Sequence, residues 1–271
     1  MKPSELSAAK PVRLPAVAGT FYPDSAPRLE RMVEDLLARP QAPVGPAPKA
    51  LIAPHAGYIY SGPIAASAFV QLPRQGVVRR VVLLGPSHFV PFEGLALSPA
   101  RAFATPLGTV PVDTTAVHLL QALPQVRMLE AAHSREHSLE VELPFLQRWL
   151  GDFTIVPLVV GHATDEEVGQ VIERLWGGPE TVFVISSDLS HYYDYQTACA
   201  LDRQTARAIE ALRGQDIGEE QACGRIPIRG LLWVAARRGL KAKTLDLRNS
   251  GDTAGPRDRV VGYGAFAFTE P

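Results

Sequence analysis

Three histidines and an aspartate follow short apolar runs of the sequence. His55 follows ALIA (50–53), His88 follows VVLL (81–84), and Asp188 and His191 follow TVFVIS (181–186). Such continuous apolar runs predict strands that are buried on both faces of a sheet. In an open α/β sheet, ligands bind in the crevice beyond the carboxyl ends of the strands. We therefore expect these four side chains to meet in one crevice, although they are far apart in the sequence.

These residue types are suited to binding a metal ion. Two neutral imidazoles, a third anionic ligand and an open coordination position fit a divalent transition metal such as zinc or non-haem iron. The candidates for the third ligand are Asp188, Glu136, Glu140 and Cys223. His191 can instead transfer protons, because the ordinary pKa of an imidazole lies near neutrality.

The two cysteines have different sequence surroundings. Cys223 precedes Pro227, which is well placed near the start of a helix. The free amides of that helix start, together with Arg225 and Arg229, would stabilise a thiolate that binds metal or attacks an electrophile. The alternative for Cys223 is a small buried apolar residue. Cys199 lies within a helical pattern and is expected to be a packing residue.

The segment HSREHSLEVELPFL (133–146) is rich in histidine and glutamate. His133 and His137 would lie one turn apart if a helix extends that far, but the H-E-x-x-H order is missing. We predict that Glu136, His137 and Glu140 support the ligands or contact substrate. A solvated helix start is the equal alternative.

The sequence HAGYIYSG (55–62) predicts a loop that leads into a helix. Gly57 gives this loop freedom, and Tyr58 and Tyr60 can line the crevice and donate phenolic hydrogen bonds. Packing against the core is the alternative role for these tyrosines.

The composition is that of an ordinary globular protein. The 271 residues are 46% hydrophobic and 20% charged, which excludes disordered and fibrous classes. Because the 27 basic residues are balanced by 28 acidic ones, the overall charge does not indicate nucleic-acid binding. The sequence has no glycine-rich phosphate loop, dinucleotide fingerprint, G-x-S-x-G elbow or CxxC pair. With no apolar stretch that would span a bilayer and only two cysteines, we expect a cytoplasmic protein without membrane contact.

Helical patterns alternate with the apolar runs. They cover 26–38, 62–72, 114–122, 138–150, 164–175, 195–213 and 228–239, and two further strands are expected at 241–249 and 260–268. This alternation favours βαβ units and a sheet between layers of helices. We expect one α/β domain over residues 1–271, with residues 1–12 as a loose leader.

Seven motifs, taken in order, resemble the Memo family, including its prokaryotic branch called AmmeMemoRadiSam system protein B. They are RLPAVAGTFYP, APHAGYIYSG, LLGPSHF, EHSLEVELPFL, SSDLSHY, ACGR and GYGAFAF, and they run from Arg13 to Phe268. The resemblance implies a fold similar to the LigB-type class III extradiol dioxygenases. That fold is a three-layer αβα sandwich around a mostly parallel mixed sheet.

The resemblance also implies a site. His55, His88 and Cys223 match the ligands proposed for iron or copper, as Fe2+ or Cu+, and Asp188 and His191 would line the same pocket. Class III dioxygenases hold iron with two His and a Glu, so the cysteine is a departure. Because a thiolate changes the metal preference and is easily oxidised, dioxygenase chemistry on catechols does not transfer directly.

Three functional hypotheses follow. The first is a metal-dependent redox or dioxygenase-like enzyme in which Asp188 orients and His191 acts as acid or base. The second is a non-catalytic binding module that receives a small molecule, a peptide or an anionic group through its histidines and Arg225, as eukaryotic relatives are described to bind phosphotyrosine peptides. The third, implied by the prokaryotic family name, is a subunit of a modification system with an AMMECR-type domain and a radical-SAM protein.

Overall fold

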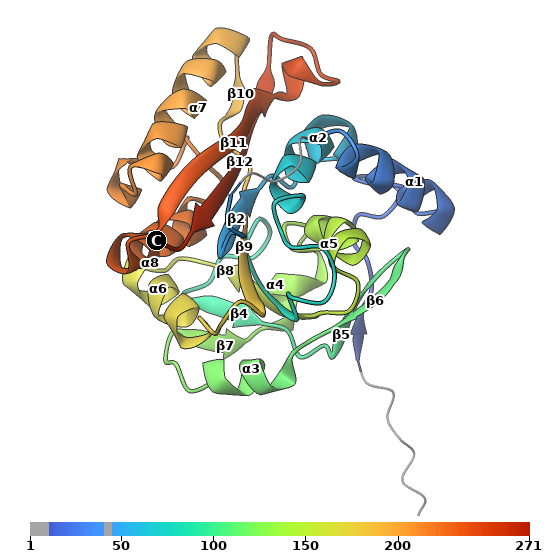
Figure 1. Ribbon diagram of the computed structural model, residues 1–271, viewed down its shortest axis with the longest axis vertical. Helices are drawn as coiled ribbons and strands as arrows, with labels where there is room; N and C mark the ends of the chain where they lie inside the picture. Colours follow the sequence, from blue (N-terminus) through green and yellow to red (C-terminus); the bar gives the residue numbers. More distant parts are fainter. Residues whose placement is uncertain (1–10, 41–44) are drawn as a thin grey trace, which may run out of the picture.

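The computed structural model describes residues 11–40 and 45–271 and is built around one mixed sheet (Figure 1). The strand order is β10-β12-β2-β9-β3-β8-β4-β7, and β11 pairs with β12. The four central strands are mutually parallel. They are β2 (Ala50–Ala53), β9 (Thr181–Ser186), β3 (Arg80–Pro86) and β8 (Thr154–Val160).

Shorter or antiparallel strands complete the sheet on both sides. β12 (Val260–Thr269) runs antiparallel to β2, to β11 (Lys241–Asn249) and to β10 (His191–Tyr193). On the other side, β4 (Leu95–Leu97) is antiparallel to β8 and parallel to β7 (Val126–Met128). The sheet is therefore mixed, with a parallel centre.

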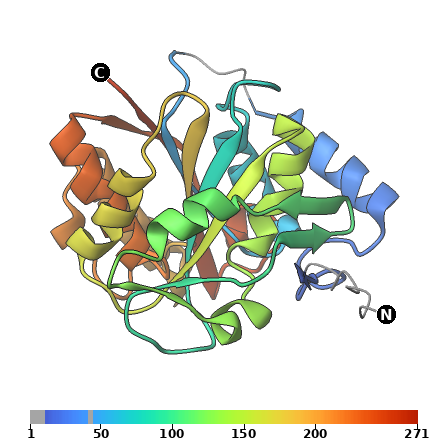
Figure 2. The same cartoon turned by 90° about the horizontal axis from the view of Figure 1, so that it is seen from below.

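Helices cover both faces of the sheet, which makes three layers (Figures 1 and 2). One layer contains α1 (Ala26–Leu37), α2 (Tyr58–Phe69) and α5 (Leu143–Leu150), and the opposite layer contains α6 (Asp165–Arg174), α7 (Tyr195–Glu210) and α8 (Arg225–Arg238). The shorter helices are α3 (Thr114–Leu120), α4 (Glu130–Ser134) and the 3-10 turns η1 (Glu140–Glu142), η2 (Gly214–Asp216) and η3 (Ser250–Asp252). The predicted αβα sandwich is confirmed.

Local sequence explains these elements. Every residue of β2 and of β9 is buried, which is why both strands read as unbroken apolar runs. Helix α1 turns Leu29, Val33 and Leu36 to the core at helical spacing. Thr164 and Glu167 form a capping box at the start of α6, in which the side chain of each residue accepts a hydrogen bond from the backbone amide of the other.

Most predicted boundaries agree with the structure within a few residues. The expected helix over 138–150 is instead η1 followed by α5, because Pro144 at the start of α5 lacks the amide that a continuous helix would need. The predicted leader, 1–12, lies outside the described residues up to residue 10, and Val12 already belongs to strand β1.

A second, small sheet escaped the sequence analysis. It consists of β1 (Val12–Arg13), β5 (Ala102–Thr105) and β6 (Gly108–Pro111). Across the described residues, no helix combines the length and the apolar composition that crossing a bilayer requires.

A buried ion pair fixes the beginning of the described chain. Arg13 Nη1 donates to Glu140 Oε2 at 2.6 Å, and the Glu140 carboxylate also accepts from the amides of Ala16 and Val17 and from the Tyr22 hydroxyl. The two side chains are only 3% and 0% exposed. This pair holds the segment from Arg13 to Tyr22 against η1.

We predict that Arg13→Met lowers the free energy of unfolding by about 3 kcal/mol, because it leaves a buried carboxylate without its counter-charge. Arg148→Met is the matched control, since Arg148 pairs with Glu30 and Glu34 at the surface. We expect Arg148→Met to lower the free energy of unfolding by less than about 1 kcal/mol. Urea denaturation measures both, and equal effects of the two changes would contradict the importance of the buried pair.

Candidate functional site

The carboxyl ends of β2, β9 and β3 bring the predicted residues together. These strands are parallel neighbours, so the loops that follow them meet at one edge of the sheet. The imidazole centroids of His55 and His88 are 5.2 Å apart, and those of His88 and His137 are 4.6 Å apart. The predicted convergence of the strand-end histidines is thus present in the fold.

These side chains line a cavity of about 530 Å³. Its lining includes Asp188 and four histidines, namely His55, His88, His137 and His191. Phe21, Tyr60, Tyr192 and Arg259 line the same cavity. A ligand in the cavity would therefore lie among imidazoles, aromatic rings and one guanidinium.

Three of the side chains can offer atoms to a single metal ion. The ligand atoms of His55, His88 and Cys223 all lie within 4.8 Å of one another. The Cys223 sulfur is 3.4 Å from His55 Nε2. A second group, His88 with Glu136 and His137, meets the same limit and shares His88 with the first.

Glu136 lies behind His88 and fixes its orientation. Its carboxylate accepts from His88 Nδ1 at 2.8 Å and from the amides of His88, His137 and Ser138 at 2.7, 2.9 and 2.9 Å. Burial alone would raise the pKa of Glu136, but the hydrogen bonds from His88 and Ser138 outweigh it and hold the pKa at about 2. His88 thus has Nδ1 protonated, which leaves Nε2 free as a ligand.

His55 is held from behind by a neutral group. Its Nδ1 is 2.7 Å from Ser186 Oγ, and its backbone amide donates to Asp188 Oδ1 at 2.9 Å. Burial and the neighbouring imidazoles of His88 and His137 lower the pKa of His55 well below its ordinary value. Burial followed by His88 likewise lowers the pKa of His137 to about 4. Both rings are therefore uncharged near neutral pH.

The setting of Cys223 differs from the expectation. Burial raises the pKa of the Cys223 thiol, and the Asp188 carboxylate raises it further, so the free side chain is a thiol. The cysteine precedes α8 as predicted, but Arg225 pairs with Glu219 and Arg229 pairs with Asp165. Neither guanidinium is free to stabilise a thiolate.

Asp188 and His191 have properties that suit proton transfer. Burial raises the pKa of Asp188 to about 7, although the amide of His55 partly opposes this rise. His191 Nδ1 lies 2.8 Å from the Leu189 carbonyl, which can only accept, so Nδ1 carries the proton. Burial lowers the pKa of His191, which leaves Nε2 as an unprotonated acceptor beside the cavity.

Three predicted pocket residues lie elsewhere. Tyr58 is buried in α2 and donates to the Val141 carbonyl at 2.6 Å, because the helix turns Tyr60 rather than Tyr58 toward the cavity. Glu140 is used in the ion pair with Arg13. Arg225 extends outward to the exposed Glu219.

Several residues that contact the site were not predicted from the sequence. Phe21, Tyr192 and Arg259 line the cavity, and Ser186 and Glu142 form hydrogen bonds behind His55. Ser186 is the last residue of β9 and Glu142 belongs to the glutamate-rich segment, so both had a weak signal. Arg259 precedes β12, and its position becomes evident only once β12 pairs with β10.

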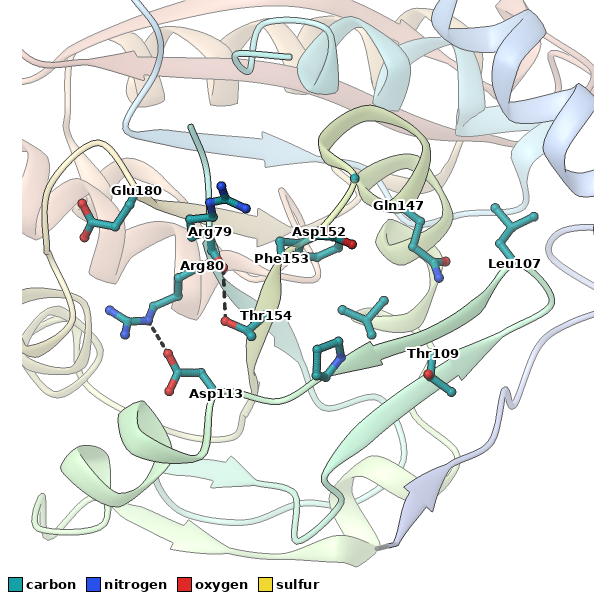
Figure 3. Close-up of a pocket in the computed structure, with 13 residues that line it drawn as sticks. Arg79, Arg80, Leu107, Thr109, Asp113, Gln147, Asp152, Phe153, Thr154 and Glu180 are labelled. Carbon is teal, nitrogen blue, oxygen red and sulfur yellow. Dashed lines mark hydrogen bonds and ion pairs between the residues drawn. The ribbon is translucent and has the colours of Figure 1, made fainter. Parts of the chain in front are cut away.

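A larger hollow, of about 770 Å³, lies at the opposite edge of the sheet (Figure 3). Arg79 and Arg80, Thr154 and Glu180 line it at the amino ends of β3, β8 and β9. Arg80 forms an ion pair with Asp113 at 2.7 Å, and the lining contains no histidine or cysteine. Of these two hollows, only the smaller one is lined by histidines, the residue type that commonly binds transition metals.

Comparisons with known proteins identify the family of this chain. The family model described as "Memo-like protein" matches residues 13–267. A MEMO1 family protein of Ignicoccus hospitalis is 36% identical over 96% of this chain and 99% of its own length. Similar proteins of Metallosphaera sedula and Aquifex aeolicus are 34% and 35% identical, each over 95% of this chain and 99% of their own length. The chain therefore belongs to the family of Memo-like proteins.

Proposed function

We propose that this protein binds one iron or copper ion, as Fe2+ or Cu+, through His55, His88 and Cys223 and acts as a redox or dioxygenase-like enzyme. The observation that carries the proposal is the distance of at most 4.8 Å between the three ligand atoms. These atoms come from three different loops, so their meeting is a property of the fold.

The donor set fits these ions. Imidazole nitrogens bind iron and copper, and a cysteine sulfur favours the softer ions, Cu+ among them. Metal-ligating histidines usually donate their second nitrogen to a carboxylate or another fixed acceptor. Here Glu136 fixes His88 and Ser186 fixes His55, and both partners leave Nε2 for the ion.

The remaining residues of the cavity can bind a substrate and move its protons. When bound, the ion supplies redox chemistry to a substrate in the cavity. His191 Nε2 is placed to accept a proton, and Asp188, with a pKa of about 7, can hold or release one near neutral pH. Phe21 and Tyr60 line the same cavity, so their rings can pack against a bound small molecule.

A second candidate function is recognition of an anionic group without catalysis. Arg259 lines the cavity and lies over the ring of Tyr192, at 4.8 Å from its centroid. Among the ion pairs of the described residues, none involves Arg259, so its guanidinium is available to a small anion or an acidic peptide. Arg259 thus takes the role that the sequence analysis gave to Arg225.

Assembly with an AMMECR-type domain and a radical-SAM protein is a third proposal. It follows from the family membership alone, through the name of the prokaryotic branch. Co-purification of the tagged chain with such partners supports it, and a lone monodisperse protein under the same conditions contradicts it.

The first prediction concerns metal content. We expect about one iron or copper per chain after anaerobic purification without a metal-affinity column, and at least about tenfold less in His88→Ala and Cys223→Ser. His118→Ala is the matched control, because His118 is exposed on α3. Elemental analysis gives the result. A metal-free wild type that also takes up neither Fe(II) nor Cu(I) would exclude the metal-binding function.

The second prediction concerns the carboxylate behind His88. Glu136→Gln should weaken Fe(II) or Cu(I) binding about tenfold to a hundredfold, because the fixed orientation and basicity of His88 are lost. Glu93→Gln breaks an exposed histidine–glutamate pair with His162 and should leave binding unchanged. Competitive titration with a chelator measures both affinities, and equal values for the two variants would refute the role of Glu136.

The third prediction tests anion recognition. Inorganic phosphate should bind to chelator-treated protein, and Arg259→Met should weaken this binding about tenfold, since a hydrogen bond to a charged group is lost. Arg257→Met is the control, because Arg257 lies over Tyr195 instead. Calorimetry measures the affinities. No detectable binding to the wild type would count against the binding-module function.

A further inference from the structure

A buried carboxyl group lies one hydrogen bond behind the candidate ligand His55. Glu142 is fully buried, and its Oε1 lies 2.8 Å from Ser186 Oγ. Within the described residues, its second oxygen, Oε2, has no hydrogen-bond partner. Neither the metal-binding proposal nor the anion-binding proposal gives this group a role.

The hydroxyl of Ser186 is in contact with three polar atoms at once. They are His55 Nδ1 at 2.7 Å, the carbonyl oxygen of Ser138 at 2.5 Å and Glu142 Oε1 at 2.8 Å. A serine hydroxyl can donate one hydrogen bond and accept two. Because a carbonyl oxygen only accepts, the single proton of Ser186 is needed for Ser138. His55 and Glu142 must then each supply a proton of their own.

Every other distribution of protons leaves one contact unfilled. If Glu142 were ionised, the single proton of Ser186 would have to serve both the Ser138 carbonyl oxygen, at 2.5 Å, and Glu142 Oε1, at 2.8 Å. One of these two oxygen–oxygen contacts would then have no proton. If His55 carried its proton on Nε2, it would compete with Ser138 for the Ser186 proton. An unpaired polar contact is costly in a buried, low-dielectric region.

Two further observations agree with this count. A neutral carboxylic acid tolerates an unpartnered carbonyl oxygen better than a carboxylate does, which accounts for Oε2. Burial raises the pKa of Glu142 well above its ordinary value, although the hydrogen bond with Ser186 opposes this rise, and the Asp188 carboxylate adds a smaller upward contribution.

We propose that Glu142 is a protonated positioning residue that donates to Ser186 and, through it, fixes His55 with the proton on Nδ1. Nε2 of His55 is then an unprotonated donor atom directed at the Cys223 sulfur, 3.4 Å away, where a metal would bind. The effect on metal binding rests on the proposed function, whereas the protonation states of Glu142 and His55 do not.

The two histidines of the site are thus held by different chemistry. His88 is backed by the ionised Glu136, and His55 is backed by a neutral hydroxyl and a neutral acid. Together with a thiolate from Cys223, an ionised Glu142 would add a further negative charge close to Asp188. The neutral acid holds the ring of His55 without adding that charge.

Infrared spectroscopy of metal-free protein tests the protonation of Glu142. At pH 8, above the pKa of about 7 of Asp188, the difference between wild type and Glu142→Gln should contain the carbonyl band of a protonated carboxyl. Only carboxylate bands in that difference would overturn the proposal. Glutamine retains the size of the side chain and its amide can donate to Ser186, so this variant should fold.

Nitrogen NMR of labelled protein tests the orientation of His55. Wild type and Glu142→Gln should both show His55 with Nδ1 protonated, whereas Glu142→Leu should show a mixture of both tautomers. A wild-type His55 that is protonated at Nε2 would overturn the proposal. If Glu142 served stability alone, Glu142→Leu would change the unfolding transition and leave the His55 tautomer unchanged, and that result would also overturn the proposal.

Fe(II) titration tests whether the chain of contacts from Glu142 through Ser186 to His55 affects metal binding. Glu142→Gln should bind Fe(II) within about threefold of wild type, while Glu142→Leu and Ser186→Ala should each bind about tenfold more weakly. The double variant Glu142→Leu/Ser186→Ala should bind Fe(II) no more weakly than Ser186→Ala alone, because both changes break the same chain of contacts. A tenfold loss in Glu142→Gln would mean that the carboxyl acts as a charge and would refute the proposal. Wild type without Fe(II) or Cu(I) affinity would reject the proposed function, while the infrared and NMR results would still decide the protonation.

Discussion

The whole site depends on burying three carboxyl groups in one short segment, from Glu136 to Glu142. Each of them would be unfavourable in a protein interior if left alone. Glu136 is stabilised as a carboxylate by three amides and His88, and Glu140 by Arg13. Glu142 is stabilised by remaining neutral. Because these partners lie on three other parts of the chain, satisfying the carboxyls also fixes β3, β9 and the N-terminal segment relative to one another.

Parallel strands make this arrangement possible. β2, β9 and β3 end at the same edge of the sheet, and each delivers one polar loop to it. The antiparallel β12 pairs with β2 and β10, and Arg259, which directly precedes it, lines the cavity. The rigid centre of the sheet therefore sets the distances between imidazoles, while the surrounding loops determine what can reach them.

The sequence predicted the parts of the fold that have strong local signals. The central strands and the main helices read clearly because continuous apolar runs and helical spacing are properties of short windows. The 3-residue strands β4 and β7 have too few residues for a pattern. In the site, His55, His88, Asp188 and His191 were found from strand ends. The burial of Tyr58, the ion pair of Glu140 and the position of Arg259 depend on contacts between distant segments, which no local pattern contains.

The order of the ligands along the chain has a consequence for how the protein matures. Cys223 is 168 positions after His55, and the helix that follows it, α8, packs against β3 and β9. β9 lies between β2 and β3 in the sheet, so His55 and His88 take their places only after β9 has inserted between the strands that carry them. Cys223 joins them when α8 docks on β3 and β9. The proposed ion would therefore meet all three side chains only after the centre of the sheet has formed.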